Sequence, residues 1–210
     1  MYRTDSHGRL NTIYILGRRG VGKTSLLNII LGKGYKENIK QSKIGITTSL
    51  YKYNDKEFII KELTDDDNYS NTNILKNQLE EIILIIVVFA IDDEDSLEYA
   101  KSLITFINSN ITYNLGIQII LFGNKYDSKK NDANTKVNQI EAENYAYEIE
   151  NCSFYELSCK TGYNTEIIEK LLTEANDNNI SYSKISDKDD YNNEESIKNH
   201  NQESKSCFIF

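Results

Sequence analysis

Eight residues near the start of the chain, GRRGVGKT at positions 17–24, have the types and spacing that suit phosphate binding. Gly17 and Gly22 bracket four residues, and Lys23 and Thr24 follow, as in the pattern G-x-x-x-x-G-K-[ST]. In such a loop successive backbone N–H groups surround the phosphates, and glycine lets the main chain approach because it lacks a Cβ. Lys23 supplies a positive charge, and the Thr24 hydroxyl suits a magnesium ion. The sequence therefore predicts a nucleotide-phosphate site.

The segments on both sides of this loop have the patterns that the motif requires. Residues 13–16 are apolar and predict a strand, and residues 25–31 carry apolar side chains at helical spacing. A helix that begins at the loop directs its positive N-terminal dipole at the phosphates. A glycine-rich turn that matches by chance would lack these flanks. The candidate phosphate-binding residues are Arg19, Gly20, Val21, Gly22, Lys23, Thr24 and Ser25.

Apolar and amphipathic segments alternate along the rest of the chain. We expect a polar connection over residues 36–47, and further strands at 49–53, 57–63, 82–91, 117–122 and 154–157. We expect helices around Ile74, Leu75 and Leu79, after an Asp95-Ser96 cap, and at 138–150 and 165–175. This alternation is typical of an α/β fold, a mostly parallel sheet with helices on both faces. Ligands of such sheets bind at the carboxyl ends of the strands.

The composition excludes several classes of protein. A net charge of −8 argues against nucleic acid as a partner, because phosphate backbones need a basic face. Three irregularly spaced cysteines indicate neither a disulfide framework nor a zinc site, and favour a reducing cytosolic environment. The first ten residues have no apolar run, so we expect no secretory signal. The longest apolar run, residues 82–91, is about half the length of a membrane span and predicts a buried strand.

Two later loops add a second kind of chemistry. The strand at 117–122 leads into GNKYD at positions 123–127, and the strand at 154–157 leads into SCK at positions 158–160. With the phosphate loop, these residues closely resemble the Ras superfamily of small GTPases, whose N-K-x-D and S-A-K motifs read guanine. The N-K-x-D motif alone is weak evidence, but the three motifs in this order are a specific sign of this resemblance. The resemblance covers residues 11–175 and implies that GTP or GDP is bound with Mg²⁺.

The resemblance also implies a role for each base-reading residue. The Asp127 carboxylate would accept two hydrogen bonds from guanine, while the stem of Lys125 lies against the base. Asn124 would connect its loop to the phosphate loop, and the Cys159 amide would donate to the guanine oxygen. The candidate base-binding residues are Asn124, Lys125, Asp127, Ser158, Cys159 and Lys160.

The family also implies an architecture and a set of partners. We expect a three-layer P-loop NTPase G domain with a mostly parallel six-stranded sheet over residues 1–176. Residues 44–46 and 90–104 look most like Rab proteins, the switches of vesicle traffic. The partners that this resemblance implies are guanine nucleotide, effectors, exchange factors and prenyl-carrier proteins.

The residues that would surround the γ-phosphate depart from the family pattern. D-x-x-G at the end of the third strand is replaced here by Glu62-Leu63-Thr64-Asp65, so Glu62 keeps a carboxylate for magnesium but Asp65 replaces the glycine. Asp66 replaces the glutamine that orients the attacking water. The magnesium-binding threonine of the first switch has become Lys43, and Ser42 would substitute for it if the loop shifts by one residue. The candidate metal ligands are Thr24, Ser42 and Glu62.

These changes lead to alternative functions. Since they cluster at the γ-phosphate and spare the base-reading motifs, we expect a switch that hydrolyses GTP weakly or not at all, although drift in a paralogue would also produce them. We expect Arg19 to contact Asp65 or Asp66 rather than to act as an arginine finger. A nucleotide-binding scaffold without hydrolysis is the main alternative. A P-loop kinase is a third, but the sequence has no obvious arginine-rich lid.

The last part of the chain, residues 177–210, predicts a flexible acidic tail with seven acidic and four basic residues. It ends in Cys207-Phe208-Ile209-Phe210, which fits the C-a-a-X signal, and a terminal phenylalanine favours geranylgeranylation of Cys207. A chance cysteine is the alternative, and Rab tails usually end in paired cysteines. No basic patch or second lipid site accompanies Cys207. We therefore expect a cytoplasmic protein that attaches reversibly to the cytosolic face of an endomembrane or the plasma membrane.

Overall fold

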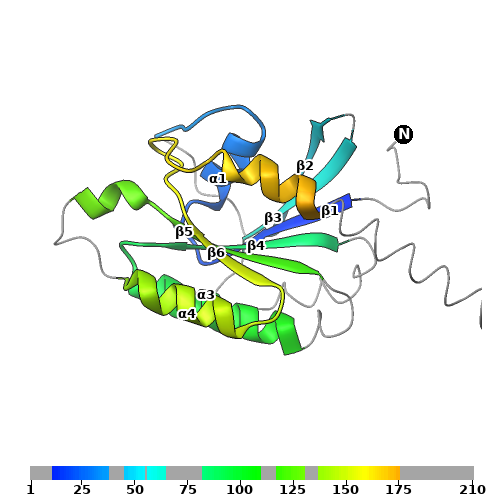
Figure 1. Cartoon of the computed structure of the whole chain (residues 1–210). Coiled ribbons are helices and arrows are strands. Elements are labelled where there is room, and N and C mark those ends of the chain that lie inside the picture. The colour runs from blue at the N-terminus through cyan, green and yellow to red at the C-terminus, as the bar shows by residue number, and fades with distance from the viewer. Residues whose placement is uncertain are drawn as a thin grey trace, which may run out of the picture.

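The computed structural model describes residues 11–37, 45–54, 56–64, 82–109, 117–130 and 137–175. Within these ranges the strands are β1 (Asn11–Leu16), β2 (Gly45–Tyr53), β3 (Lys56–Thr64), β4 (Ile82–Ala90), β5 (Gln118–Asn124) and β6 (Cys152–Glu156). They form one sheet in the order β2-β3-β1-β4-β5-β6 (Figure 1). Only β2 and β3 pair antiparallel among these neighbours, and the other pairs are parallel. The predicted six-stranded, mostly parallel sheet is confirmed.

Helices cover both faces of this sheet, as predicted. The helices are α1 (Lys23–Ile30), α3 (Glu94–Ile107), α4 (Gln139–Glu148), a 3-10 helix η4 (Tyr126–Lys130) and a further helix at 167–175. In Figure 1, α3 and α4 lie together on one face, while α1 and the helix at 167–175 lie on the other. The fold is therefore three-layered. The helix expected around Ile74, Leu75 and Leu79 lies outside the described residues.

The central strands alternate between two hydrophobic cores. From Leu84 onward, successive β4 residues point alternately to the two sides: Leu84 and Ile86 pack with α1 and the helix at 167–175, whereas Ile85 and Val87 pack with α3 and α4. All nine β4 residues are buried. A strand covered on both faces needs a continuous apolar run, which explains the composition of this segment.

The β2–β3 hairpin begins earlier than the sequence predicted. Residues 36–47 were expected to be connection throughout, but β2 starts at Gly45, because Gly45 pairs with Thr64 and Thr47 pairs with Glu62. Pairing with β3 thus extends the strand by four residues before the predicted start at Ser49. Lys56, which was expected in the connection between the two strands, pairs with Tyr53 and belongs to β3.

The Asp95-Ser96 cap predicted for α3 is wrong. Asp93 occupies the N-cap position, although its side chain makes no cap hydrogen bond, and α3 begins at Glu94. Ser96 lies buried in the first turn, where its hydroxyl accepts from the Ala90 amide at 2.9 Å and donates to the Asp93 carbonyl at 2.6 Å. The serine fastens the helix to the end of β4 instead of capping it.

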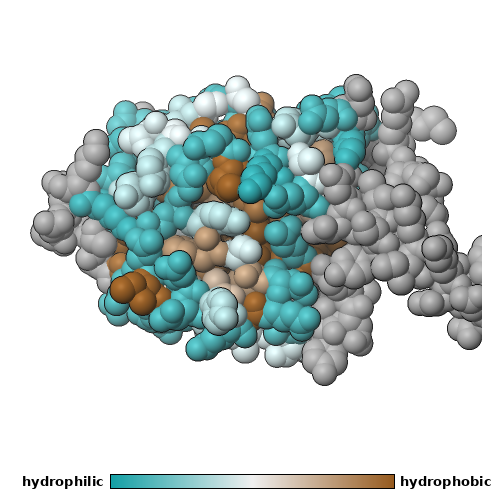
Figure 2. All heavy atoms as spheres, viewed as in Figure 1, coloured by the Kyte–Doolittle hydropathy of each residue, from teal (hydrophilic) through white to brown (hydrophobic). Residues whose placement is uncertain are grey.

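The face of the molecule in Figure 2 is mostly hydrophilic, with small separate hydrophobic patches over the described residues. Among the helices that the structure describes, none is both long enough and apolar enough to span a bilayer. Buried apolar side chains of these helices, such as Leu103 and Ile104 of α3, pack against the sheet.

Candidate functional site

The sequence-predicted motifs lie at one edge of the sheet. Residues 17–22 follow β1, residues 91–93 follow β4, residues 125–127 follow β5 and residues 157–163 follow β6. These four strands are parallel, so their carboxyl ends share an edge. A ligand site in an open α/β sheet forms at such an edge.

The phosphate loop ends in an open helix N-terminus. Gly22 is the N-cap of α1, and the first turn contains neither a side-chain cap hydrogen bond nor an acidic residue. The helix N-terminus carries partial positive charge, and its first N–H groups have no partners within the helix. This geometry fits an anionic phosphate group.

Two glycines of the loop are required by close backbone contacts. A Cβ at Gly17 would lie 2.2 Å from the Val88 carbonyl oxygen, and one at Gly22 would lie 2.1 Å from Asn124 Nδ2. Both residues also have positive φ angles, 138° and 103°, which side chains disfavour. The motif's fixed glycines therefore let the loop pack against β4 and β5.

Lys23 lies folded back over its own loop. Its side chain is buried, and Nζ donates to the Gly17 carbonyl at 2.8 Å and to the Arg18 carbonyl at 3.0 Å. Burial of an ammonium group is costly without such acceptors. They hold the positive charge within the phosphate loop, where the motif requires it.

The predicted magnesium ligands Thr24 and Glu62 are neighbours. Thr24 Oγ1 donates to Glu62 Oε1 at 2.5 Å, and Glu62 is buried at the end of the β1–β3 pairing. Magnesium prefers hard oxygen ligands, and a hydroxyl that donates its proton to a carboxylate keeps its lone pairs for a cation. This pair fits a magnesium ion, although Glu62 is one methylene longer than the family's aspartate. Ser42, the third candidate, lies outside the described residues.

Asn124 connects three elements of the site. It is buried at the end of β5, and its Nδ2 donates to the Val21 carbonyl at 2.9 Å, so the predicted connection to the phosphate loop is observed. Its Oδ1 accepts from the Cys159 amide at 3.1 Å. Asn124 thus holds the Cys159 segment beside β5, and the role predicted for this amide toward guanine stays a prediction.

Asp127 and Ser158 face each other across the two base-reading loops. Ser158 Oγ donates to Asp127 Oδ1 at 2.5 Å, and the same hydroxyl accepts from the Thr161 amide at 3.2 Å. The hydroxyl fixes the direction of the carboxylate.

Burial, assisted by the negative charge of Asp127, raises the pKa of the Cys159 thiol to about 12, so this cysteine is not a nucleophile at neutral pH.

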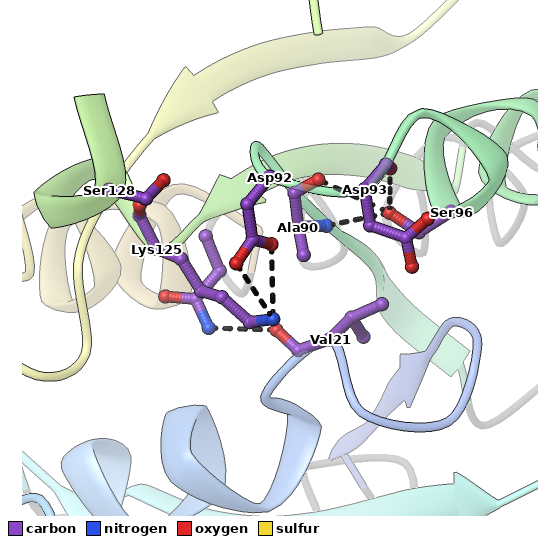
Figure 3. A network of polar contacts seen from close by, with 8 residues as sticks. Val21, Ala90, Asp92, Asp93, Ser96, Lys125 and Ser128 are labelled. Atoms are coloured by element: carbon purple, nitrogen blue, oxygen red, sulfur yellow. Dashed lines mark hydrogen bonds and ion pairs between the residues drawn. The ribbon is translucent and has the colours of Figure 1, made fainter. Parts of the chain in front are cut away.

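Lys125 makes an ion pair that the sequence did not suggest. Its Nζ lies 3.1 Å from Asp92 Oδ1 and 3.4 Å from Oδ2, and Figure 3 shows the lysine reaching from the end of β5 toward Asp92 and Val21. Lys125 has a left-handed backbone, with φ of 66°. The contact with Asp92 holds the side chain of this strained residue across the site.

The model of the Ras family matches residues 12–177 of the chain. The chain belongs to the Ras family. The match supports a small GTPase that acts as a nucleotide-binding switch. A search of curated proteins found no match to the chain.

Sequence reasoning missed several polar partners of this Ras-family site. Asp92 pairs with Lys125, and Asp95 lies 3.5 Å from Arg18 of the phosphate loop. Both acids follow β4, so the rule that ligand sites form at strand ends offered a signal for them. Asp65 and Asp66, the expected partners of Arg19, lie outside the described residues, as do Lys43 and Cys207.

Removal of the Asn124 side chain from this Ras-family site should cause a measurable loss of stability. Replacing Asn124 by Ala removes the hydrogen bonds to the Val21 carbonyl and from the Cys159 amide, and each unmet buried group costs about 1–3 kcal/mol. We expect the free energy of unfolding to fall by about 2–6 kcal/mol in urea titrations followed by circular dichroism. Asn144→Ala on the exposed side of α4 is the control. Equal stability of the two variants would contradict the proposed connection.

Proposed function

We propose that this Ras-family protein is a guanine-nucleotide switch of Rab-like type, acting in vesicle transport, whose GTP hydrolysis is slow. The observation that supports it best is the Asn124 amide, which brings the phosphate loop and both base-reading loops to one edge of the sheet. The phosphate-binding and base-reading residues lie far apart in the sequence but at the same edge of the sheet. A single nucleotide that occupies both sites accounts for this arrangement.

On the base side, the site offers a carboxylate with a fixed direction. Asp127 would accept from the two guanine N–H groups, while the Lys125 stem would lie against the base. The Ser158 hydroxyl, at 2.5 Å, holds Asp127 in place before the base arrives. Adenine offers no matching donors, so the carboxylate would lose its partners with an adenine nucleotide.

On the phosphate side, residues 19–25 would surround the phosphates. Lys23 and the N-terminus of α1 would supply the positive charge there. Lys23 would exchange its carbonyl contacts in the loop for phosphate oxygens. Thr24 and Glu62 would hold Mg²⁺, and the bound ion would neutralise charge that develops between the β- and γ-phosphates.

Slow hydrolysis follows from the substitutions in the second switch. A unit negative charge about 5 Å from a γ-phosphate oxygen costs about 3 kcal/mol at an effective dielectric near 20, and Asp65 and Asp66 replace two neutral residues there. Aspartate is also shorter than glutamine and is poorly suited to orient water. The same substitutions favour the alternative function, a membrane-recruited scaffold that binds GDP or GTP without turnover.

Membrane attachment and partners form the last part of the proposal. The Cys207-Phe208-Ile209-Phe210 terminus favours a geranylgeranyl group, with prenyl-carrier proteins, effectors and exchange factors as partners. One prenyl chain without a basic patch gives weak binding, which favours reversible attachment to the cytosolic face of an endomembrane or the plasma membrane.

The first test concerns nucleotide preference. We expect the protein to bind GDP about 10⁴-fold or more tightly than ADP, because a site built for guanine N–H groups leaves its carboxylate unpaired with adenine. Asp127→Asn should weaken GDP binding sharply, whereas Glu143→Gln on the exposed side of α4 should not change it. Equal affinity of the parent for GDP and ADP, measured by calorimetry, would refute guanine specificity.

The second test concerns turnover. In single-turnover assays with purified protein, we expect hydrolysis slower than that of ordinary small GTPases without a helper protein. The double variant Asp65→Gly, Asp66→Gln should raise the rate, because it removes two charges and restores the residue that orients water. Glu143→Gln, Glu148→Gln on α4 is the charge-matched control. A parent rate equal to that of ordinary family members would exclude the slow-switch proposal.

The third test concerns the C-terminus. Mass spectrometry of the protein isolated from cells should find a prenyl group on Cys207, and Cys207→Ser should remove both the modification and membrane association. An intact, unmodified C-terminus on the cellular protein would rule out this attachment.

A further inference from the structure

Two tyrosines stack between the base-reading loops. The rings of Tyr126, in the loop after β5, and Tyr163, in the loop after β6, lie 4.1 Å apart between centroids with an interplanar angle of 11°. Stacked aromatic pairs stabilise contacts beyond the area that they bury. The family motifs fix neither residue, because Tyr126 takes the variable position of N-K-x-D and Tyr163 lies three residues after S-C-K.

Tyr126 lies between the two residues that would contact the base. Lys125 before it has a left-handed backbone, with φ of 66°, and Asp127 follows it. A side-chain-bearing residue keeps such a conformation only when its surroundings hold it there. The Tyr126 amide donates to the Leu157 carbonyl at 3.1 Å, so the strained turn is attached to the β6 loop through both its backbone and its ring.

Tyr163 is attached in turn to the residue that directs Asp127. The Ser158 amide donates to the Tyr163 carbonyl at 3.0 Å, and the Ser158 hydroxyl donates to Asp127. The ring pair and this hydroxyl bond therefore join the same two loops at separate points. Displacement of Tyr163 would move the backbone that carries Ser158.

A lysine supports the same ring pair. Lys129 Nζ lies 4.8 Å from the centre of the Tyr126 ring and 2.7 Å from Glu156 Oε1, so it connects η4 to β6. Tyr126, Asp127, Lys129, Thr161 and Tyr163 line one cavity of about 370 Å³. The stacked rings thus adjoin the carboxylate that would read the base.

We propose that Tyr163 is a positioning residue for nucleotide retention and acts through its stack with Tyr126. The stack holds the Lys125–Asp127 turn against the Ser158 loop, so that the carboxylate keeps its direction while nucleotide is bound. This inference rests on the proposed function, guanine-nucleotide binding. It assigns a role to the ring of Tyr163 and none to its hydroxyl.

The test measures release of a fluorescent methylanthraniloyl derivative of GDP from the full-length protein. Tyr163→Ala should speed release by about 2- to 12-fold, the factor that corresponds to a stacked aromatic pair. Tyr163→Phe keeps the ring and should release at the parent rate. Tyr147→Ala, at a tyrosine that is 91% exposed on α4, is the control for loss of a surface tyrosine and should also release at the parent rate.

A double-variant cycle tests whether Tyr163 acts through Tyr126. Tyr126→Ala should release at least as fast as Tyr163→Ala, because it removes both the stack and the Lys129 contact. Adding Tyr163→Ala to Tyr126→Ala should not speed release further, because the stack is already lost. Multiplicative effects in the double variant would overturn the proposal, as would equal effects of Tyr163→Ala and Tyr163→Phe or a parent-like rate for Tyr163→Ala.

A nucleotide-free measurement separates this inference from the proposed function. Hydrogen exchange on nucleotide-stripped protein should show reduced protection of residues 124–130 and 157–164 in Tyr163→Ala, and parent-like protection in Tyr163→Phe. If the parent does not bind the GDP derivative, guanine-nucleotide binding fails and the retention role fails with it, whatever the exchange shows. If the parent binds and Tyr163→Ala has parent-like release and exchange, the proposed role of the stack alone is overturned.

Discussion

The arrangement of this site depends on one buried carboxamide. Asn124 lies at the end of a central parallel strand, and its donor and its acceptor both meet backbone groups of other loops. A buried amide that loses a partner pays its full desolvation cost, so the phosphate loop and the Cys159 segment have little freedom to move away from β5. Gly22 is part of the same constraint, because only a residue without Cβ leaves room for the amide.

The sheet supplies the rigid support that this carboxamide needs. β4 is buried along its whole length, and its side chains pack into two cores that separate helix pairs cover. Loops at the carboxyl ends of such strands start from fixed positions. Short-range contacts are therefore enough to fix the conformation of each loop. Ser96 is an example, since one buried hydroxyl joins α3 to the end of β4.

Sequence patterns predicted the elements well where burial alone determines them. The run at 82–91 and the helical spacing of Leu97, Ala100 and Leu103 required no knowledge of partners, and the structure contains both elements. The start of β2 and the cap of α3 were mispredicted because pairing with β3 and the hydroxyl bond of Ser96 depend on tertiary contacts. Motif spacing predicted the residues of the candidate site, but it did not indicate that Asp92 pairs with Lys125 or that Tyr126 stacks on Tyr163.

In an acidic protein with a phosphate-binding loop, nearby carboxylates determine how much positive charge the loop presents. The chain carries a net charge of −8, and acids after β4 pair with two cations of the site: Asp92 with Lys125 and Asp95 with Arg18. Both pairs are partly exposed, so solvent screens them and they orient the side chains more than they stabilise the fold. Lys23 is buried, and its Nζ donates to two uncharged carbonyl groups of the phosphate loop. Lys23 and the N-terminus of α1 therefore both direct positive charge toward the phosphate loop.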